Sequence, residues 1–284
     1  MDAEVDVPAG ASRDFEIERQ LLVDAIYLKY HYDFRAYAGA SMKRRLLGAM
    51  SHFGCATLSQ LQDRVMHEPK LFPRLLDFLT VQVSEMFRDP GYFLAMRESV
   101  VPLLRTYPSL KVWIAGCSAG EEAYSFAVLL REEGLLDRTL IYATDINPQA
   151  LKLAEAGVYD VSRMAAFTEN HRRSGGCGSL SDHYSAAYGR AVIDKSLRKH
   201  MVFSDHSLAT DSVFAEVQLV SCRNVLIYFD RALQDRALAL FGQSLCRRGF
   251  LGIGSKESVR FSSQAAVFDD LVPRERIYRK AADA

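Results

Sequence analysis

A loop of small residues followed by two acids lies near the middle of the chain. Residues 111–115 (KVWIA) read as a buried strand, and the loop GCSAG (116–120) leads into a helix that starts with Glu121 and Glu122. Glycines there let the backbone approach a ligand, and the first helical turn offers N–H groups without partners. Gly116 does not begin a G-x-G-x-x-G fingerprint, and the P-loop lysine is absent. The loop therefore fits a ligand held without its phosphates, although the helix dipole alone also favours acids in a first turn.

Asp145 strengthens the case for a nucleoside. It follows residues 139–144 (TLIYAT), which read as a second strand. Open α/β sheets bind ligands at the carboxyl ends of their strands, where an acid commonly holds a ribose diol. A nucleoside recognised without phosphates points to S-adenosylmethionine rather than NAD or ATP, and a sulfonium cation suits a pocket that contains carboxylates. An aspartate that only forms a turn remains the alternative.

Two further segments combine polar and aromatic residues in a way that plain structural roles explain poorly. Residues 83–90 (VSEMFRDP) lie between the two main parts of the chain, and residues 221–230 (SCRNVLIYFD) begin where an expected strand ends. Arg223 and Asn224 therefore stand at the carboxyl end of that strand. This is again the edge of the sheet where ligands bind.

The pattern of apolar residues divides the chain into a helical part and an alternating part. From residue 14 to about residue 82, apolar residues recur at intervals of three and four residues, which predicts an all-helical segment. Beyond residue 105 the expected strands lie at 111–115, 139–144, 216–221 and 249–254, with helices at 121–133, 148–156 and 231–245, and residues 276–280 could form a last edge strand. This alternation predicts an α/β fold with parallel strands and helices on both faces.

Residues 157–200 break the alternation. They are rich in glycine and serine and contain no helical stripe. We expect an insertion at the edge of the sheet domain, in which residues 190–193 and 200–203 form a small hairpin.

Composition excludes several classes of protein. The 284 residues contain 35 basic and 35 acidic side chains, which argues against a general nucleic-acid binder. The first residues are acidic and polar, unlike a signal peptide, and no apolar run is long enough to cross a bilayer. The five cysteines are scattered, and neither they nor the histidines have metal-ligand spacing. We expect a cytoplasmic protein with reduced thiols, no metal and no membrane insertion.

The motifs SEMFRD, AGCSAGEEAYS, ATDIN and CRNVLIYFD, in this order, resemble the CheR family of chemotaxis-receptor methyltransferases. The resemblance runs from about residue 15 to residue 280. It implies a Rossmann-like methyltransferase sheet domain that depends on S-adenosylmethionine, carries a small antiparallel β insertion and follows an all-helical N-terminal domain. The implied domains are a flexible N-terminus (1–13), a helical domain (14–85) and a methyltransferase domain (86–284, with the insertion at about 157–200).

The resemblance also implies the site residues. Arg88 and Tyr228 match the active-site arginine and tyrosine of the family. The implied contacts to the cofactor are Gln82, Ser84, Arg88, Gly116, Glu122, Asp145, Ser207, Leu208, Cys222, Arg223 and Asn224. The family pattern N-x-T-x-F-F-R has glutamine at 82 and serine at 84 here, and the family's Asn-Leu pair reads Ser207-Leu208. These changes keep the polar character of each position.

The implied reaction is methylation of glutamate side chains in chemoreceptor-type signalling proteins, which yields methyl esters and S-adenosylhomocysteine. A carboxylate is ionised at pH 7, so the nucleophile needs no general base. Residues 29–74 carry eight basic and three acidic side chains, with Lys43, Arg44 and Arg45 as the densest cluster. This excess fits the docking of an acidic helical substrate, since matching charges speed encounter. A solvated helix face is the alternative reading of the same charges.

Two other functions remain open from the sequence. One is a methyltransferase that acts on a small molecule or RNA, and the balanced charge argues against RNA. The other is a non-catalytic module that senses S-adenosylmethionine, against which the presence of Arg88, Asp145 and Tyr228 argues. We expect a monomer.

Overall fold

The structure, a computed structural model, describes residues 9–282, with side chains from residue 13 onward. The described chain forms two compact units, residues up to Val81 together with Tyr228–Asp230, and Gln82–Ile227 together with the segment from Arg231 onward. Residues 82–85, expected in the helical domain, therefore lie in the second unit. Residues 1–8 of the expected flexible N-terminus lie outside the described residues, and the first helix already begins at Ala9.

The N-terminal unit is helical, as the spacing of apolar residues predicts. Its helices are α1 (Ala9–Tyr30), α2 (Gly39–Phe53), α3 (Leu58–His67) and α4 (Leu71–Leu79). The start of α3 follows from a local signal, because the Thr57 side chain accepts a hydrogen bond from the backbone N–H of Gln60. Leu22, Leu46 and Leu61 lie in its fully buried core.

Three residues from far along the sequence complete this unit. The backbone N–H of Ala38 donates to the Tyr228 carbonyl (2.9 Å), and the N–H of Asp230 donates to the Ala36 carbonyl (2.9 Å). The ring of Phe229 packs against Tyr37 with 5.1 Å between ring centroids. The end of the CRNVLIYFD motif thus belongs to the helical unit.

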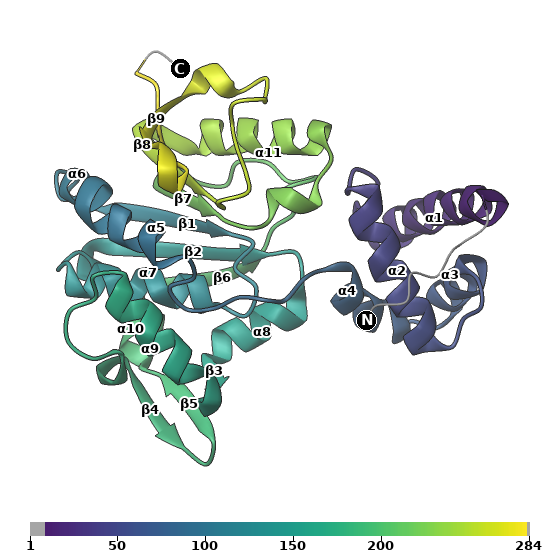
Figure 1. Cartoon of the computed structure of the whole chain (residues 1–284), viewed down its shortest axis with the longest axis horizontal. Coiled ribbons are helices and arrows are strands. Elements are labelled where there is room, and N and C mark those ends of the chain that lie inside the picture. The colour runs from purple at the N-terminus through teal and green to yellow at the C-terminus, as the bar shows by residue number, and fades with distance from the viewer. Residues whose placement is uncertain (1–8, 283–284) are drawn as a thin grey trace. The chain divides into compact units, whose positions relative to one another are not determined.

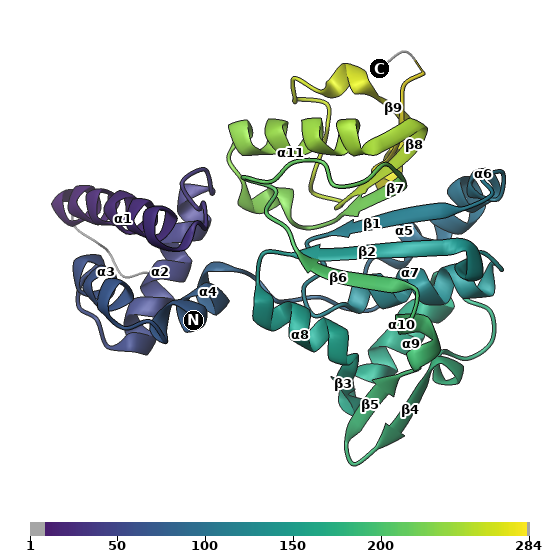
Figure 2. The same cartoon turned by 180° about the vertical axis from the view of Figure 1, so that it is seen from behind.

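The second unit contains a seven-stranded sheet in the order β6-β2-β1-β7-β8-β10-β9 (Figures 1 and 2). The strands are β1 (Leu110–Ala115), β2 (Thr139–Asp145), β6 (Met201–Asp205), β7 (Val217–Cys222), β8 (Leu245–Ile253), β9 (Phe268–Val272) and β10 (Ile277–Lys280). The first five strands of this order pair in parallel, and β10 is antiparallel to both neighbours. The expected parallel sheet is confirmed.

Helices cover both faces of this sheet, with α7 and α11 on opposite sides in both views (Figures 1 and 2). The helices are α5 (Pro90–Ala95), the π-helical turn η1 (Met96–Val100), α6 (Val101–Leu104), α7 (Glu121–Glu132), α8 (Pro148–Ala156), α9 (Met164–Arg173), α10 (Lys195–Arg198) and α11 (Arg231–Ser244). Short 3-10 turns are η2 (Leu136–Arg138), η3 (Val161–Arg163), η4 (Leu180–His183), η5 (Leu226–Tyr228), η6 (Ala265–Val267) and η7 (Pro273–Glu275). The expected helices at 121–133, 148–156 and 231–245 are confirmed to within a residue.

Two expectations about strand pairing were wrong. The segment at 276–280 forms β10, which lies between β8 and β9 and is not an edge strand. The expected hairpin of residues 190–193 with 200–203 does not form, because residues 201–205 become β6 and extend the large sheet beside β2. Strand pairing depends on residues distant in sequence, so the local pattern could not reveal either partner.

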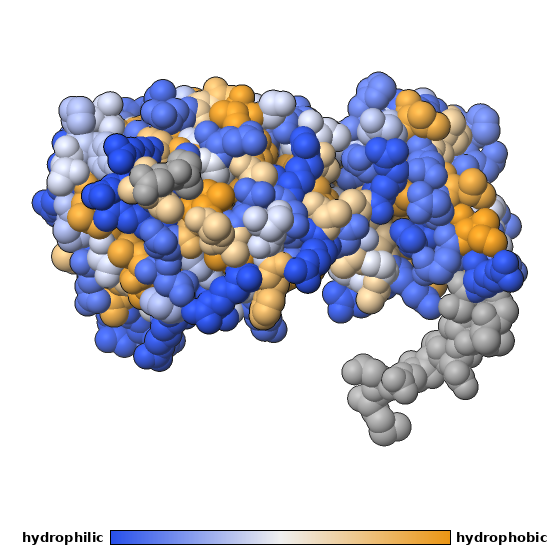
Figure 3. Space-filling model, turned by 90° about the horizontal axis from the view of Figure 1, so that it is seen from above, coloured by the Kyte–Doolittle hydropathy of each residue, from blue (hydrophilic) through white to orange (hydrophobic). Residues whose placement is uncertain are grey.

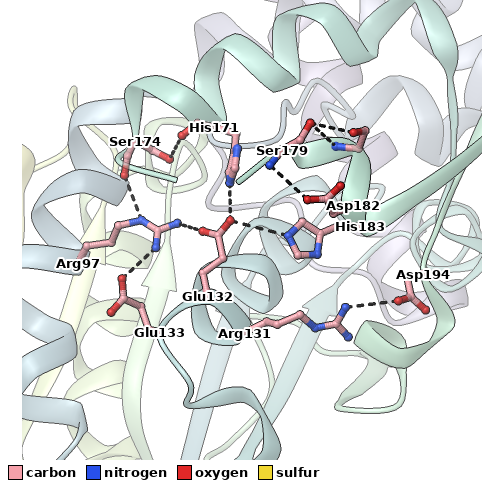
Figure 4. Close-up of polar contacts among 11 residues, drawn as sticks. Arg97, Arg131, Glu132, Glu133, His171, Ser174, Ser179, Asp182, His183 and Asp194 are labelled. Carbon is pink, nitrogen blue, oxygen red and sulfur yellow. Dashed lines mark hydrogen bonds and ion pairs between the residues drawn. The ribbon is translucent and has the colours of Figure 1, made fainter. Parts of the chain in front are cut away.

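The insertion forms a second sheet in the order β3-β5-β4, from β3 (Val158–Asp160), β4 (Tyr184–Ala187) and β5 (Arg190–Ile193). A buried charge cluster joins it to the sheet domain (Figure 4). Glu132 at the end of α7 pairs with Arg97 and accepts a hydrogen bond from His171 (2.7 Å), while His183 lies 3.7 Å away. One carboxylate therefore ties η1, α9 and η4 together.

The apolar residues of the second unit pack between sheet and helices. Trp113, Phe126 and Phe250 are each at most 1% exposed. On the face seen in Figure 3, hydrophobic residues form small groups among hydrophilic ones. The sheet is a rigid platform for the loops at its strand ends.

Candidate functional site

The carboxyl ends of β1, β2 and β7 lie side by side. β1 pairs with β2 on one side and with β7 on the other. Strands β2 and β6 lie on one side of β1, and β7 and β8 lie on the other, so the strand order reverses beside β1. Ligands bind at such a topological switch point in open α/β sheets. The loop 116–120, Asp145 and the segment 222–224 all start from this edge.

The loop after β1 is folded tightly over the end of β2. The backbone N–H groups of Gly116 and Cys117 both donate to the Thr144 carbonyl, at 2.8 and 2.9 Å. Gly116 has a φ of +76°, and a Cβ there would lie 2.4 Å from the Val225 side chain. Glycine is thus required at 116 by close packing against the loop after β7.

Asp145 is buried at the centre of this edge. Its Oδ2 accepts from the backbone N–H of Ser118 (2.8 Å), and its Oδ1 accepts from the N–H of Asn147 (2.9 Å). Burial raises the pKa of this carboxyl, although hydrogen bonds from the backbone of Asn147 and Ser118 act in the opposite direction. A carboxylate offers about four acceptor positions, so its oxygens can also accept from ribose hydroxyls.

Gln82 lies beside the same loop, because the Ser118 hydroxyl donates to Oε1 of Gln82 (2.7 Å). Ser84 is held through its carbonyl, which accepts a hydrogen bond from Arg163. Arg163 also forms an ion pair with Glu121 (2.9 Å) at the start of α7. The segment that precedes Arg88 is therefore fixed to both the loop and the helix.

Glu122 and Arg223 form the core of a polar network. Glu122 accepts from the Ser221 hydroxyl (2.7 Å) and pairs with Arg223 (3.3 Å). Arg223 also pairs with Asp89 (2.7 Å) and stacks over the Tyr92 ring, with 4.1 Å to its centroid. The side chain of Arg223 is 1% exposed. Its charge is therefore balanced inside the protein, and it orders the strand end.

Arg88 is held by its backbone while its side chain keeps few contacts. Its carbonyl accepts from Arg223 (2.9 Å), and both flanking residues, Phe87 and Asp89, have positive φ angles of 52° and 54°. The Phe87 N–H donates to the Ser125 hydroxyl (2.8 Å). The guanidinium donates a 3.4 Å hydrogen bond to the Val83 carbonyl. Arg88 is half-buried, and the turn that carries it is held by these hydrogen bonds.

Ser207 and Leu208 follow β6, whose Asp205 stands in register with Asp145. The backbone N–H of His206 donates to the Asp145 carbonyl (3.3 Å). The Ser207 N–H donates to Asp211 (2.9 Å), and Leu208 is buried. This segment lies at the far side of Asp145 from the loop 116–120.

Cys222 ends β7 and is fully buried. Burial raises the pKa of the Cys222 and Cys117 thiols well above the ordinary value, so both stay protonated. Neither is a nucleophile. All five cysteines are free in this structure.

Glu257 was missed by the sequence analysis. It is 5% exposed, and its carboxylate accepts from the backbone N–H groups of Asn224 (3.1 Å), Ile227 (3.1 Å) and Gly254 (2.6 Å). It therefore fixes the loop after β7, in which Asn224 has a φ of +60°. The available signal was an acid in the polar run SKES directly after an apolar strand.

The remaining predicted residues belong to the helical unit. Tyr228 lies under the guanidinium of Arg45, with 4.3 Å to the ring centroid. Arg45 is buried and donates to the Leu79 carbonyl, whereas Arg44 is exposed and Lys43 is half-buried. Burial lowers the pKa of Arg45. Of the three expected docking residues, Arg44 presents its charge fully at the surface.

The donor set suits S-adenosylmethionine. The edge offers buried carboxylates and neutral polar groups, and Arg223 is already paired with Glu122 and Asp89, so its charge is not available to a phosphate. Within residues 9–282, no cluster of histidine, cysteine and acidic side chains could hold a metal ion. Over the same residues, no helix combines the length and apolarity needed to cross a membrane.

Comparison with known families matches both units. The CheR methyltransferase SAM-binding domain matches residues 82–272, and the CheR methyltransferase all-alpha domain matches residues 17–80. The chain is 61% identical over 271 residues to a protein of Pseudomonas putida KT2440 named as methyltransferase Cher3, covering 95% of this chain and 99% of that protein.

Relatives named chemotaxis protein methyltransferase are more distant. That of Listeria innocua is 32% identical over 229 residues, covering 80% of this chain and 84% of the relative. That of Vibrio parahaemolyticus is 28% identical over 227 residues, covering 77% and 80%. The expected methyltransferase fold is confirmed. The chain belongs to the CheR methyltransferase family, and its cofactor is S-adenosylmethionine.

Proposed function

We propose that this protein transfers the methyl group of S-adenosylmethionine to glutamate side chains of chemoreceptor-type signalling proteins. The products are glutamate methyl esters and S-adenosylhomocysteine, and the reaction adjusts the output of the receptor. The observation that carries the proposal is the convergence of Gln82, Asp145 and the Glu122–Arg223 pair at one sheet edge of a CheR-family chain. Relatives named chemotaxis protein methyltransferase support the choice of substrate.

When bound, S-adenosylmethionine supplies a methyl group on a sulfonium sulfur, which is a good leaving group. Asp145 would accept hydrogen bonds from the ribose, and Gln82 and Asn224 would contribute polar contacts from either side of the loop 116–120. The carboxylate of Glu122 adds negative potential where the ligand carries positive charge. Arg223 acts by ordering Glu122 and Asp89, to which it is paired.

The nucleophile is the substrate's own carboxylate. A glutamate oxygen would form a bond to the methyl carbon while the bond between this carbon and sulfur breaks. The electron pair of the broken carbon–sulfur bond would stay on sulfur. The carboxylate is already ionised at neutral pH, so no proton is transferred. The protein therefore contributes alignment and removal of water, which are worth roughly 7–11 kcal/mol.

Arg88 orients the substrate carboxylate. A guanidinium presents two parallel N–H groups to a carboxylate, and the rigid turn at Phe87–Asp89 sets the position from which it does so. An ion pair between Arg88 and the substrate that is too tight would neutralise the negative charge of the nucleophile. The family resemblance gives Tyr228 the second catalytic position.

The test is incubation of the full chain with radiolabelled S-adenosylmethionine and membranes that contain chemoreceptors. Label that becomes attached to receptor and is released by base identifies carboxyl methyl esters. Receptor variants with glutamine at the candidate glutamates are the matched control. Base-stable label would instead identify methylation of another group.

A sensor of S-adenosylmethionine, the alternative left open by the sequence, is not favoured by the family match. Cofactor binding without methylation of any membrane fraction would favour it. A methyltransferase for another substrate would transfer label to a soluble component under the same conditions.

A further inference from the structure

A cleft with a volume of about 450 Å³ opens beside the loop after β7. It is lined by Leu226 and Ile227, by the segment after β8 and by α11, the helix that lies over the sheet in Figure 1. This volume is in the range of sites that hold a ligand or several side chains of a partner. None of the predicted cofactor residues lines it.

The cleft adjoins the cofactor edge through a shared carboxylate. Glu257 lines the cleft and at the same time accepts hydrogen bonds from Asn224 and Ile227. The cleft therefore begins within three residues of Asn224, along a loop whose course Glu257 fixes.

Basic side chains outnumber acidic ones in the lining of the cleft. Arg231, Lys256 and Arg276 line it, and neither Lys256 nor Arg276 forms an ion pair with any residue that the structure describes. Both carboxylates in the lining are engaged by other groups. Glu257 accepts three backbone N–H groups, and Asp235 accepts from the backbone N–H of Ser263 (3.3 Å).

The cleft also offers apolar surface. Phe261 is 75% exposed and Ile227 is 38% exposed, and both line the cleft. Arg231 donates to the Phe261 carbonyl and holds the backbone that carries this ring. Aromatic residues and arginine are enriched at protein-binding surfaces.

We infer that this cleft binds a segment of the protein substrate that carries acidic and apolar side chains and adjoins the glutamate to be methylated. Charge complementarity selects this occupant, because two cations without acidic partners face the cleft beside an exposed ring. The inference rests on the proposed function for the identity of the substrate, while binding to the cleft can be measured by itself. It makes Lys256 and Arg276 determinants of substrate specificity.

The test compares wild type with the double variant Lys256→Glu/Arg276→Glu. The control is Lys152→Glu/Lys199→Glu, which changes two exposed lysines of the same unit and alters net charge equally. The probe is a fluorescent peptide in which glutamate and leucine recur with helical spacing, and binding is followed by anisotropy. We expect the cleft variant to bind this peptide about tenfold more weakly, equivalent to about 1.4 kcal/mol. The difference from the control is expected to shrink at high salt.

A second variant, Phe261→Ala, separates the apolar contact from charge. We expect it to weaken peptide binding with little dependence on salt. In methylation assays, the double variant is expected to raise KM for receptor about tenfold while kcat and the Kd for S-adenosylmethionine change less than twofold. Equal peptide affinity in the cleft and control variants overturns the inference. Loss of peptide binding together with no receptor methylation by wild type contradicts the proposed function and leaves the cleft as a peptide site.

Discussion

The backbone N–H of Ser118 donates a hydrogen bond to Oδ2 of Asp145, at 2.8 Å. This bond joins the loop after β1 to the end of β2. The Ser118 hydroxyl continues the connection to Gln82. Three segments far apart in sequence thus meet near one buried carboxylate. A substitution at Asp145 is therefore expected to affect all three segments at this edge of the sheet.

We expect Asp145→Ala to weaken binding of S-adenosylmethionine by about tenfold or more, since it removes the acceptor proposed for the ribose and frees the Ser118 N–H. Isothermal titration of the folded variant measures this. Asp205→Ala is the matched control, because Asp205 ends the neighbouring strand in register with Asp145 and is exposed. Unchanged affinity in Asp145→Ala would remove this residue from the cofactor site.

Arg88→Lys tests the catalytic role of the guanidinium. Lysine keeps the charge but not the forked geometry, so we expect turnover to fall about 100-fold, the cost of misplacing a reacting group by about 1 Å. Cofactor affinity should fall much less. Arg105→Lys, at an exposed arginine of the same unit, is the control. A proportional loss of turnover and affinity would show that Arg88 acts only in binding.

Variants of Arg44 and Arg45 should distinguish an effect on substrate docking from an effect on the stability of the fold. We expect Arg44→Glu to slow receptor methylation at low ionic strength without a change in thermal stability, because its charge is exposed and acts on encounter. Arg45→Ala should lower the free energy of unfolding by roughly 1–3 kcal/mol, since it leaves the Leu79 carbonyl unpaired. Methylation rates and denaturant melts of both variants check this. A wild-type rate in Arg44→Glu at low salt would place docking elsewhere.

Glu257 should affect the cofactor site indirectly, by holding the loop that contains Asn224. We expect Glu257→Ala to reduce cofactor affinity about fivefold or more, because three backbone N–H groups lose their acceptor and the Asn224 loop relaxes. Asp235→Ala, at the other acid of the same cleft, should leave affinity unchanged. Equal affinities in the two variants would contradict a positioning role. Hydrogen exchange of the amides at 224 and 227 provides a direct readout of the loop.

Glu132 should make the sheet domain sensitive to acid. Burial by itself would raise its pKa, but hydrogen bonds from His171, His183 and Arg97 outweigh burial and hold the pKa below its ordinary value. A carboxyl with a depressed folded-state pKa contributes stability above its unfolded pKa, and this is lost as pH falls through about 4 and below. We expect Glu132→Gln to cost about 3 kcal/mol at pH 7 and to flatten the loss of stability below pH 4. Urea melts at several pH values test this, and parallel curves for wild type and variant would contradict it.

Local signals in the sequence were sufficient for many elements of the fold. Helix α8 begins and ends where predicted because Asn147 caps it, Pro148 occupies its first turn and Gly157 ends it with a φ of +61°. β1 and β2 were predicted because an apolar run followed by small or acidic residues marks a buried parallel strand and its carboxyl end. Such patterns bring Gly116, Asp145 and Arg223 to one edge, since parallel strands end on the same side.

Features that depend on distant partners could not be read in this way. β10 lies inside the sheet because β9 pairs with its outer side, and β6 joins β2 rather than residues 190–193. Glu257 gains its role from the turns of a loop more than 25 residues earlier in the chain. Arg45 belongs to a basic run, yet packing against Tyr228 and Leu79 buries it. Residue type and spacing therefore determine which chemistry is available at the strand ends. The burial and the partners of each side chain depend on contacts between segments that are far apart in sequence. The free energy of those contacts cannot be read from a local pattern.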